Sequence, residues 1–352
     1  MSFDFDAGVH LPHRMQPGLR RLAAGAVQLT PSAVPNRGVA RHLREKLAVL
    51  WAFRDQALLT TPGFDAGPAL RALAAHAAVE HPQALQLDGN HWRAPGLGWA
   101  LDADDPPHDI GTGWPEIGTL LREISPGWRR AALLSLAFAE DFAVLDASTG
   151  TLPWLAVALP SMWAPELKVG RSFADVHAPV ADNRLIVGAA APLVKLVTGD
   201  GERWERFVWT LTAHPRLHAH PQRVDAARWA ALAGTGGTPE GGTCGTPDNA
   251  DADADADVDA RARHITAHTW WRTERQTFIP VPGGRPGAAQ AVFTILVNST
   301  PLCRAFDAPG QAARVHHALA SMSPAVLAYR GLAAVQAPLL RWLAWRAAEP
   351  AR

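Results

Sequence analysis

Five runs of strand-like sequence in the second half of the chain constrain its fold more than any other feature. The first two flank the turn-like segment 147–151, as in a hairpin, and a helix-like stretch at 185–197 separates them from the other three. Five strands with helices between the second and the third predict an α+β fold. We expect a single antiparallel sheet with helices against one face. The five runs cover residues 142–146, 154–159, 206–212, 270–279 and 291–297.

Helical spacing characterises the sequence on both sides of these strands. Between residues 36 and 59, leucines recur at three- and four-residue steps, and similar patterns cover 67–78 and 128–139. The tail from Gln311 to Ala348 predicts two helices, divided near Ser321–Pro324. We therefore expect a helical N-terminal region at 1–139, a sheet core at 140–305 and C-terminal helices at 306–352.

One tract inside this core differs from the rest in composition. Residues from about 234 to 262 are rich in Gly, Thr and Pro and then in alternating Asp and Ala. Such a segment has little apolar surface to offset the entropy lost on ordering. We expect a disordered insertion between the third and fourth strands.

Charge and composition narrow the possible partners and the location. The 33 basic residues balance 33 acidic ones, with no basic stripe, which argues against nucleic acid or an anionic membrane surface. No apolar stretch approaches the roughly 20 residues that cross a bilayer, and the N-terminus lacks a secretory signal pattern. We expect a cytoplasmic protein that acts on small molecules, with Cys244 and Cys303 as free thiols.

The run Arg272–Phe278 carries several polar side chains on a predicted strand. Alternation directs Arg272, Glu274 and Gln276 to one face of the sheet. Arg275, with a threonine two residues away on either side, points to the other. One interpretation is a ladder of ion pairs on a solvated face. The other is a pair of guanidinium groups that bind an anionic ligand such as two propionates, and the spacing fits both.

Histidine is the residue type best suited to hold a metal here. His177 stands in the apolar sequence Val-His-Ala-Pro-Val, where it is either a structural residue or a neutral imidazole for an iron porphyrin. The denser cluster His214, His218 and His220 lacks an interleaved carboxylate, so we do not expect a metal there. Phosphate-loop, dinucleotide-binding and serine-nucleophile motifs are missing, so an enzyme with this sequence would need a bound cofactor.

Several blocks of sequence occur in the order and at the spacing of one known family. The most specific is Arg-x-Glu-Arg-Gln-Thr-Phe at 272–278, and the others include Gln16–Leu22, Leu159–Trp163, Gly170–Val180 and Phe293–Ile295. These blocks resemble those of the haem-dependent oxidative N-demethylase alpha subunit family, whose members are similar to dimethylamine monooxygenase. The likeness covers most of the chain, from about residue 10 to about residue 305.

The resemblance implies a PAS-like five-stranded antiparallel sheet that carries haem b. It implies His177 as the axial iron ligand, because haem PAS domains take this ligand from the helical region between the second and third strands. It also makes Glu274 a catalytic pocket carboxylate that attracts an ammonium substrate. Arg272 and Arg275 would hold propionates or brace Glu140 and Asp141. The full set of residues implied for cofactor binding is His177, Arg171, Trp163, Arg272, Arg275 and Gln276.

The activity implied by the family is oxidation of an N-methyl amine with O₂ to formaldehyde and the demethylated amine. A separate flavin/NADPH-dependent reductase would supply the electrons, since this chain has no flavin or nicotinamide motif. Three departures remove polar groups expected in the ligand pocket: Leu296–Asn298 replaces Arg-Thr-Tyr, Met162 replaces Arg and Val208 replaces Asn. Two alternatives therefore stay open, a haem-binding sensor or carrier without turnover and a PAS-like scaffold without haem.

Overall fold

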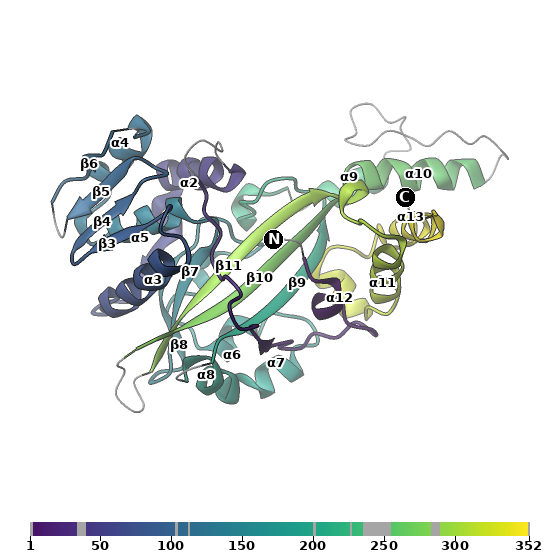
Figure 1. Ribbon diagram of the computed structural model, residues 1–352. Helices are drawn as coiled ribbons and strands as arrows, with labels where there is room; N and C mark the ends of the chain where they lie inside the picture. The colour runs from purple at the N-terminus through teal and green to yellow at the C-terminus, as the bar shows by residue number, and fades with distance from the viewer. Residues whose placement is uncertain are drawn as a thin grey trace.

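A long antiparallel sheet crosses the molecule and separates two layers of helices (Figure 1). This computed structural model describes residues 3–33, 40–102, 105–111, 113–199, 202–225, 227–234, 255–282 and 289–350. Over those ranges the sheet has seven strands, in the order β1-β9-β10-β11-β7-β8-β2. The five predicted strands are β7 to β11, so the α+β class is confirmed, but two short edge strands make the sheet larger than predicted. The strands are β1 (Arg20–Arg21), β2 (Leu58–Thr60), β7 (Asp141–Asp146), β8 (Thr151–Ala156), β9 (Trp204–Thr212), β10 (Trp270–Val281) and β11 (Gln290–Pro301).

Strand β10 lies at the centre of the sheet's long strands and is buried on both faces. It pairs with β9 on one side and β11 on the other. Ile279 belongs to the apolar cluster that includes the helix α3, whereas its neighbour Phe278 belongs to the cluster that includes α8. A ladder of ion pairs on a solvated face is therefore excluded for this strand.

Helices cover both faces of the sheet, although the sequence predicted them on one. On one side α3 contacts β10 and β11, and α5 contacts β8. On the other side α8 contacts β7, β10 and β11, and α6 and α7 precede it in the chain. Two-sided burial explains why β7, β8 and β11 are apolar along most of their length. The helices are α2 (Arg41–Ala57), α3 (Gly67–Glu80), α5 (Pro126–Ala137), α6 (Phe173–His177), α7 (Arg184–Gly188) and α8 (Ala190–Thr198).

The N-terminal region contains the three predicted helices, as α2, α3 and α5, but it is not purely helical. It also holds a second antiparallel sheet, which has four strands within the described residues, in the order β3-β4-β5-β6. These strands have two to four residues each, and turns with left-handed glycines at Gly89 and Gly98 join them. Such short runs carry too little alternation to be recognised in sequence. The elements are β3 (Gln86–Asp88), β4 (His91–Ala94), β5 (Trp99–Asp102), β6 (His108–Asp109) and the helix α4 (Pro115–Glu123).

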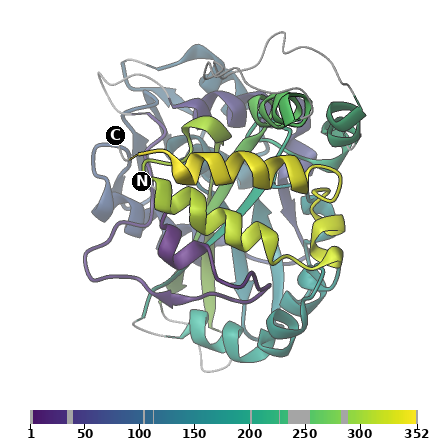
Figure 2. The same ribbon diagram turned by 90° about the vertical axis from the view of Figure 1, so that its right-hand side faces the viewer.

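The C-terminal helices pack together over a second apolar cluster, which they share with residues of β9 and β10, and they run side by side across the view in Figure 2. In the described part of the tail there are three, not the predicted two, because the second half breaks again after Tyr329. The first break is where the sequence placed it, and there the Ser323 hydroxyl caps the next helix by accepting from the Val326 amide at 3.1 Å. The helices are α11 (Pro309–Ala320), α12 (Pro324–Tyr329) and α13 (Gln336–Ala348).

The expectation of disorder for the insertion is wrong at its end, since α10 (Asp255–Ala267) is a helix that contacts α13. Residues 235–254 of that tract lie outside the described residues. The helix α9 (Arg228–Gly234) precedes the tract, and α1 (Phe5–Gly8) lies near the N-terminus. Cys303 is disulfide-bonded, so the expectation of a free thiol there is also wrong. None of the described helices has both the length and the apolar character needed to cross a membrane.

Candidate functional site

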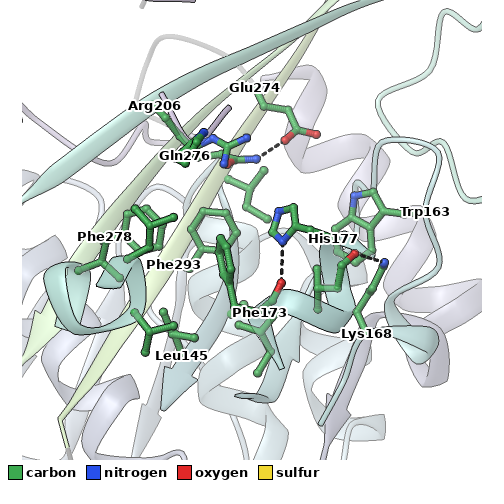
Figure 3. A pocket seen from close by; sticks show the side chains of 18 of the residues that line it. Leu145, Trp163, Lys168, Phe173, His177, Arg206, Glu274, Gln276, Phe278 and Phe293 are labelled. Carbon is green, nitrogen blue, oxygen red and sulfur yellow. Dashed lines mark hydrogen bonds between the residues drawn. The ribbon is translucent and has the colours of Figure 1, made fainter. Parts of the chain in front are cut away.

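A mostly apolar cavity lies between the sheet and the helices α6 to α8 (Figure 3). It encloses about 1130 Å³ of space between atoms, part of it open to solvent. Its walls come from alternate residues of the five central strands, and Pro17, Leu19 and Tyr329 close it from more distant parts of the chain. The stacked rings of Phe278 and Phe293, with centroids 4.9 Å apart, form part of the wall. The lining, mostly apolar with a few convergent polar groups, is typical of a site for an organic ligand.

His177 presents its imidazole to this cavity at the end of α6. The helix begins at Ser172, whose hydroxyl accepts from the Asp175 amide at 3.1 Å and so fixes the first turn. The His177 Nδ1 lies 2.8 Å from the carbonyl oxygen of Phe173, one turn earlier. Among the described residues, no hydrogen bond is formed by the other ring nitrogen, Nε2.

The charge state of His177 follows from its surroundings. Burial lowers its pKa to about 4, and the nearby Arg206 and Lys168 act in the same direction. The ring is therefore neutral at pH 7. When Nδ1 carries the proton and donates it to the Phe173 carbonyl, Nε2 keeps a free lone pair. This is the tautomer and the hydrogen-bonding pattern of a histidine that ligates a metal.

Three polar residues gather on the sheet side of the cavity. Arg206 on β9 stands directly opposite Gln276 on β10, and Glu274 lies one alternation further along β10. The Gln276 amide nitrogen donates to the Glu274 carboxylate at 2.5 Å. Figure 3 shows the three side chains together above the imidazole of His177.

Arg206 is a cation whose hydrogen-bonding capacity is not satisfied. Its Nε is buried and has no hydrogen-bond partner among the described residues. Burial lowers the pKa of its guanidinium group, and the Glu274 carboxylate acts in the opposite direction. Since a buried donor without an acceptor is costly, the arrangement favours an acceptor group of a ligand, such as a carboxylate, beside the Arg206 Nε.

Lys168 places a second cation at the edge of the cavity. Its ammonium group donates to the Val176 carbonyl at 2.5 Å, and burial lowers its pKa. Neither Arg206 nor Lys168 was singled out from the sequence. Arg206 begins a predicted strand, but its position facing Gln276 depends on strand register, which the sequence did not provide.

The structure brings four of the residues named from the sequence together on the cavity wall. They are Trp163, His177, Glu274 and Gln276. Arg171 is exposed and is not part of the lining. The two arginines of the 272–278 run also lie outside the lining.

Arg272 serves as a cross-link between loops. It is buried, and its Nε donates to the Ser161 hydroxyl at 2.8 Å. The two terminal nitrogens donate to backbone carbonyls, at 2.9 Å to Arg216, 3.1 Å to Pro160 and 2.6 Å to Leu217. The N–H donors of Arg272 are thus engaged by acceptors within the protein. Arg272 is therefore poorly placed to hold a propionate.

Arg275 points to the opposite face of the sheet, as strand alternation predicted. Its Nε is 2.9 Å from the Glu205 carboxylate, and it also donates to the Val27 carbonyl. Bracing of Glu140 and Asp141 by arginine is likewise not observed. The cation at that position is Lys46, whose ammonium lies 3.2 Å from Asp141 and also donates to the backbone carbonyl of Glu140.

The three departures from the family pattern lie away from the cavity wall. Leu296 and Asn298 pair across the ladder with Arg275 and Thr273, so they belong to the face opposite Glu274. Met162 is 45% exposed, and Val208 lines a smaller neighbouring pocket. Val297, the middle residue of the first departure, pairs with Glu274 and shares its face of the sheet. The expectation that these changes remove polar groups from the ligand pocket stays a prediction.

The fold and the site together place a neutral imidazole, a carboxylate and a guanidinium group on the wall of one mostly apolar cavity. The sequence profile described as "haem-dependent oxidative N-demethylase, alpha subunit-like" matches residues 127–340. That range contains every residue of the cavity lining except Pro17 and Leu19. The chain belongs to this haem-dependent oxidative N-demethylase alpha subunit-like family, and the resemblance found in the sequence is confirmed. No curated protein matches the chain.

Proposed function

We propose that this protein is a haem-dependent oxygenase that oxidises an N-methyl amine to formaldehyde and the demethylated amine. The observation that carries the proposal is His177, a neutral imidazole in an apolar cavity with Nδ1 tied to the Phe173 carbonyl. The family membership supports the same cofactor. When bound, haem b supplies the iron at which O₂ is reductively activated.

The residues of the cavity fit a haem group. His177 would provide the axial ligand through Nε2, with the bond from Nδ1 fixing the ring's orientation. The apolar wall, including Phe278 and Phe293, suits the face of a porphyrin. Arg206, with its buried and unpaired Nε, is the residue we assign to a propionate in place of Arg272 and Arg275. Trp163 and Gln276 would contact the cofactor from the same wall.

Glu274 is the proposed substrate-binding group. Its carboxylate lies on the cavity wall and accepts a hydrogen bond from Gln276, which orients it. A buried carboxylate attracts an alkylammonium ion and can accept its proton, which leaves the amine nitrogen neutral. The apolar walls exclude water from the methyl group. Glu274 is therefore expected to set the selectivity for amines.

The proposal includes a second protein. The family is that of an alpha subunit, and we infer that a flavin/NADPH-dependent reductase delivers the electrons. We also propose that β7 to β11 form a PAS-like core. Two features support this fold: the five strands neighbour one another in the sheet, and the helical segment with His177 lies between the second and third of them.

The first test is the absorption spectrum of the purified protein after reconstitution with haem b. We expect one haem per chain, a Soret band and its loss or marked shift in His177→Ala. His218→Ala is the matched control, because His218 also has Nδ1 bonded to a carbonyl, that of Ala158 at 2.7 Å, but lies outside the cavity lining. An unchanged spectrum in His177→Ala would refute the assignment of the ligand.

The second test is catalysis. With a reductase and NADPH, we expect methylated amines to release formaldehyde, and Glu274→Gln to raise the KM for the amine while the Soret band is kept. A normal haem spectrum with no formaldehyde from any methylated amine would favour the alternative, a haem-binding sensor or carrier without turnover. If the purified protein bound no haem, the better description would be the other alternative, a PAS-like scaffold without haem.

A further inference from the structure

Two histidines and an aspartate converge on the outer face of the small sheet, away from the cavity just described. His91 on β4 pairs directly with Asp102 on β5, and His108 on β6 pairs with Ala100, two residues from Asp102. Residues two apart on a strand share a face, so all three side chains project from the same side. Their neighbours Trp92 and Leu101 are buried on the other side of the sheet.

The ligand atoms of the three side chains are already close together. The His91 Nδ1 is 2.6 Å from Asp102 Oδ1, and the His108 Nε2 is 3.9 Å from Asp102 Oδ2. One atom from each residue can be chosen so that all three lie within 4.8 Å of one another. The two imidazole rings face each other at 19°, with centroids 5.5 Å apart. The Asp102 carboxylate thus has an imidazole nitrogen at each of its oxygens.

We propose that His91, Asp102 and His108 form a binding site for a divalent transition-metal ion, with Zn²⁺ as the first candidate. Two imidazoles and a carboxylate are a ligand set that suits Zn²⁺ and its neighbours in the series rather than Mg²⁺ or Ca²⁺. A tetrahedral Zn²⁺ with bonds near 2 Å separates its ligand atoms by about 3.3 Å. The pair at 2.6 Å therefore has to open by about 0.7 Å, and the pair at 3.9 Å has to close by about 0.6 Å.

Such movements need only side-chain rotation. The side chains of His91, Asp102 and His108 are 33%, 42% and 43% exposed, so they are not locked by packing. The strands that carry them hold the backbone in place, because β5 pairs with both β4 and β6. The exposure also leaves room for water to complete the coordination and for the ion to exchange.

Arg93 is the nearby charge that opposes a cation on this face. It lies two residues from His91, pairs with Ala100 and is exposed. Its charge is screened by water at such a position, so its effect on metal binding is small. The Asp102 carboxylate supplies the opposite charge at a shorter range, since it is within hydrogen-bond distance of His91.

A metal at this position would bind a residue from each of three adjacent strands. It would connect β4, β5 and β6 across the face on which His91 and Asp102 are partly exposed. Ion binding to the folded state alone raises the stability of that state. The site is thus a means of stabilising a sheet whose strands have only two to four residues.

The test is calorimetric titration of the tag-free full chain with ZnCl₂ at pH 7.5. We expect one Zn²⁺ per chain with a micromolar dissociation constant, and a rise in Tm that grows with Zn²⁺ concentration. His91→Gln and Asp102→Asn should each weaken binding by about tenfold or more. Arg93→Gln should tighten it by about threefold, the size expected when one exposed like charge is removed.

A competing pair of histidines provides the control. His264 on α10 and His268 just after that helix have ring centroids 4.8 Å apart, which is close enough for a competing Zn²⁺ site. All titrations are therefore repeated with proteins that also carry His268→Gln. This substitution should leave Zn²⁺ binding unchanged. The proposal is overturned by no binding at 100-fold excess over protein at about 10 μM, which excludes micromolar affinity. Binding as tight in His91→Gln as in the parent protein, or binding that disappears with His268→Gln, overturns it as well.

Discussion

Removing the guanidinium group of Arg272 tests whether this residue is a structural cross-link or a haem ligand. The substitution Arg272→Met keeps most of the apolar stem and deletes the donors. Four hydrogen bonds between 2.6 and 3.1 Å are lost, to Ser161 and to three backbone carbonyls. At about 1.5 kcal/mol for each bond from a charged donor, the gross loss is about 6 kcal/mol. Relief of the desolvation cost of the buried charge offsets several kcal/mol of this.

The net cost expected for Arg272→Met is therefore about 3 kcal/mol of unfolding free energy. With a urea m-value of about 3 kcal/mol/M, the midpoint of unfolding should fall by about 1 M. Haem binding per folded molecule should stay unchanged, because the side chain lies outside the cavity lining. Urea titration followed by tryptophan fluorescence measures the first quantity, and haem titration measures the second.

Arg272→Lys is the matched variant. It keeps the positive charge but cannot reach carbonyls on both loops at once, so we expect a loss close to that of Arg272→Met. A midpoint that moves by less than about 0.3 M in Arg272→Met would refute the cross-link. So would intact stability combined with weaker haem binding, which would return Arg272 to the role of a propionate ligand.

Three further predictions concern other buried groups. Arg206→Gln should weaken haem binding about tenfold, because a charge-assisted hydrogen bond in a buried site is lost. Arg203→Gln is the control and should not weaken haem binding, because Arg203 lies outside the cavity lining. The rate of haem transfer to apomyoglobin measures the effect of both substitutions. Burial raises the pKa of Glu140 to about 7 from its ordinary value of 4.5, so the folded state holds this proton more tightly than the unfolded state. The contribution of Glu140 to stability is therefore present below pH 4.5 and is lost as the pH rises through 7. The urea midpoints of unfolding at pH 5 and pH 8 should differ less in Glu140→Gln than in the parent protein. Glu274→Asp should keep partial selectivity for methylated ammonium ions, whereas Glu274→Gln should lose it, as measured by KM for charged and neutral substrates.

The elements that could be predicted from the sequence are those with long, regular patterns. The run at 270–279 extends over ten residues without Gly or Pro, and the structure makes it a strand of twelve. The small sheet was missed because its strands are two to four residues long. The interpretation of the Arg272 run as solvated failed because sequence shows alternation but not the second layer of helices that buries the other face.

The site was predicted in part for a related reason. His177 was found because a single imidazole in apolar sequence is conspicuous. Arg206 was missed because its significance depends on the β9–β10 register, which sets it opposite Gln276 across a distance of 70 residues in sequence. Arg272 was assigned to the ligand because guanidinium groups suit propionates and the family resemblance includes it, but it lies outside the cavity lining although it shares a face with Glu274. The sequence shows which residues share a face of a strand, but it does not show how far a cavity extends along that face.

The burial of β10 on both faces has a practical consequence for redesign of this protein. Its even-numbered residues from 274 to 278 border the cavity, while Arg275 and Thr277 make contacts on the opposite face with Glu205 and Thr294. Substitutions that retune the ligand can therefore be confined to alternate positions, with their cross-strand neighbours Arg206 and Ile295. A single-residue insertion in this strand would instead exchange the two sets, turning Arg275 towards the ligand and Glu274 towards the other layer. Sequence libraries for new substrates should vary side chains here and leave the length of the strand untouched.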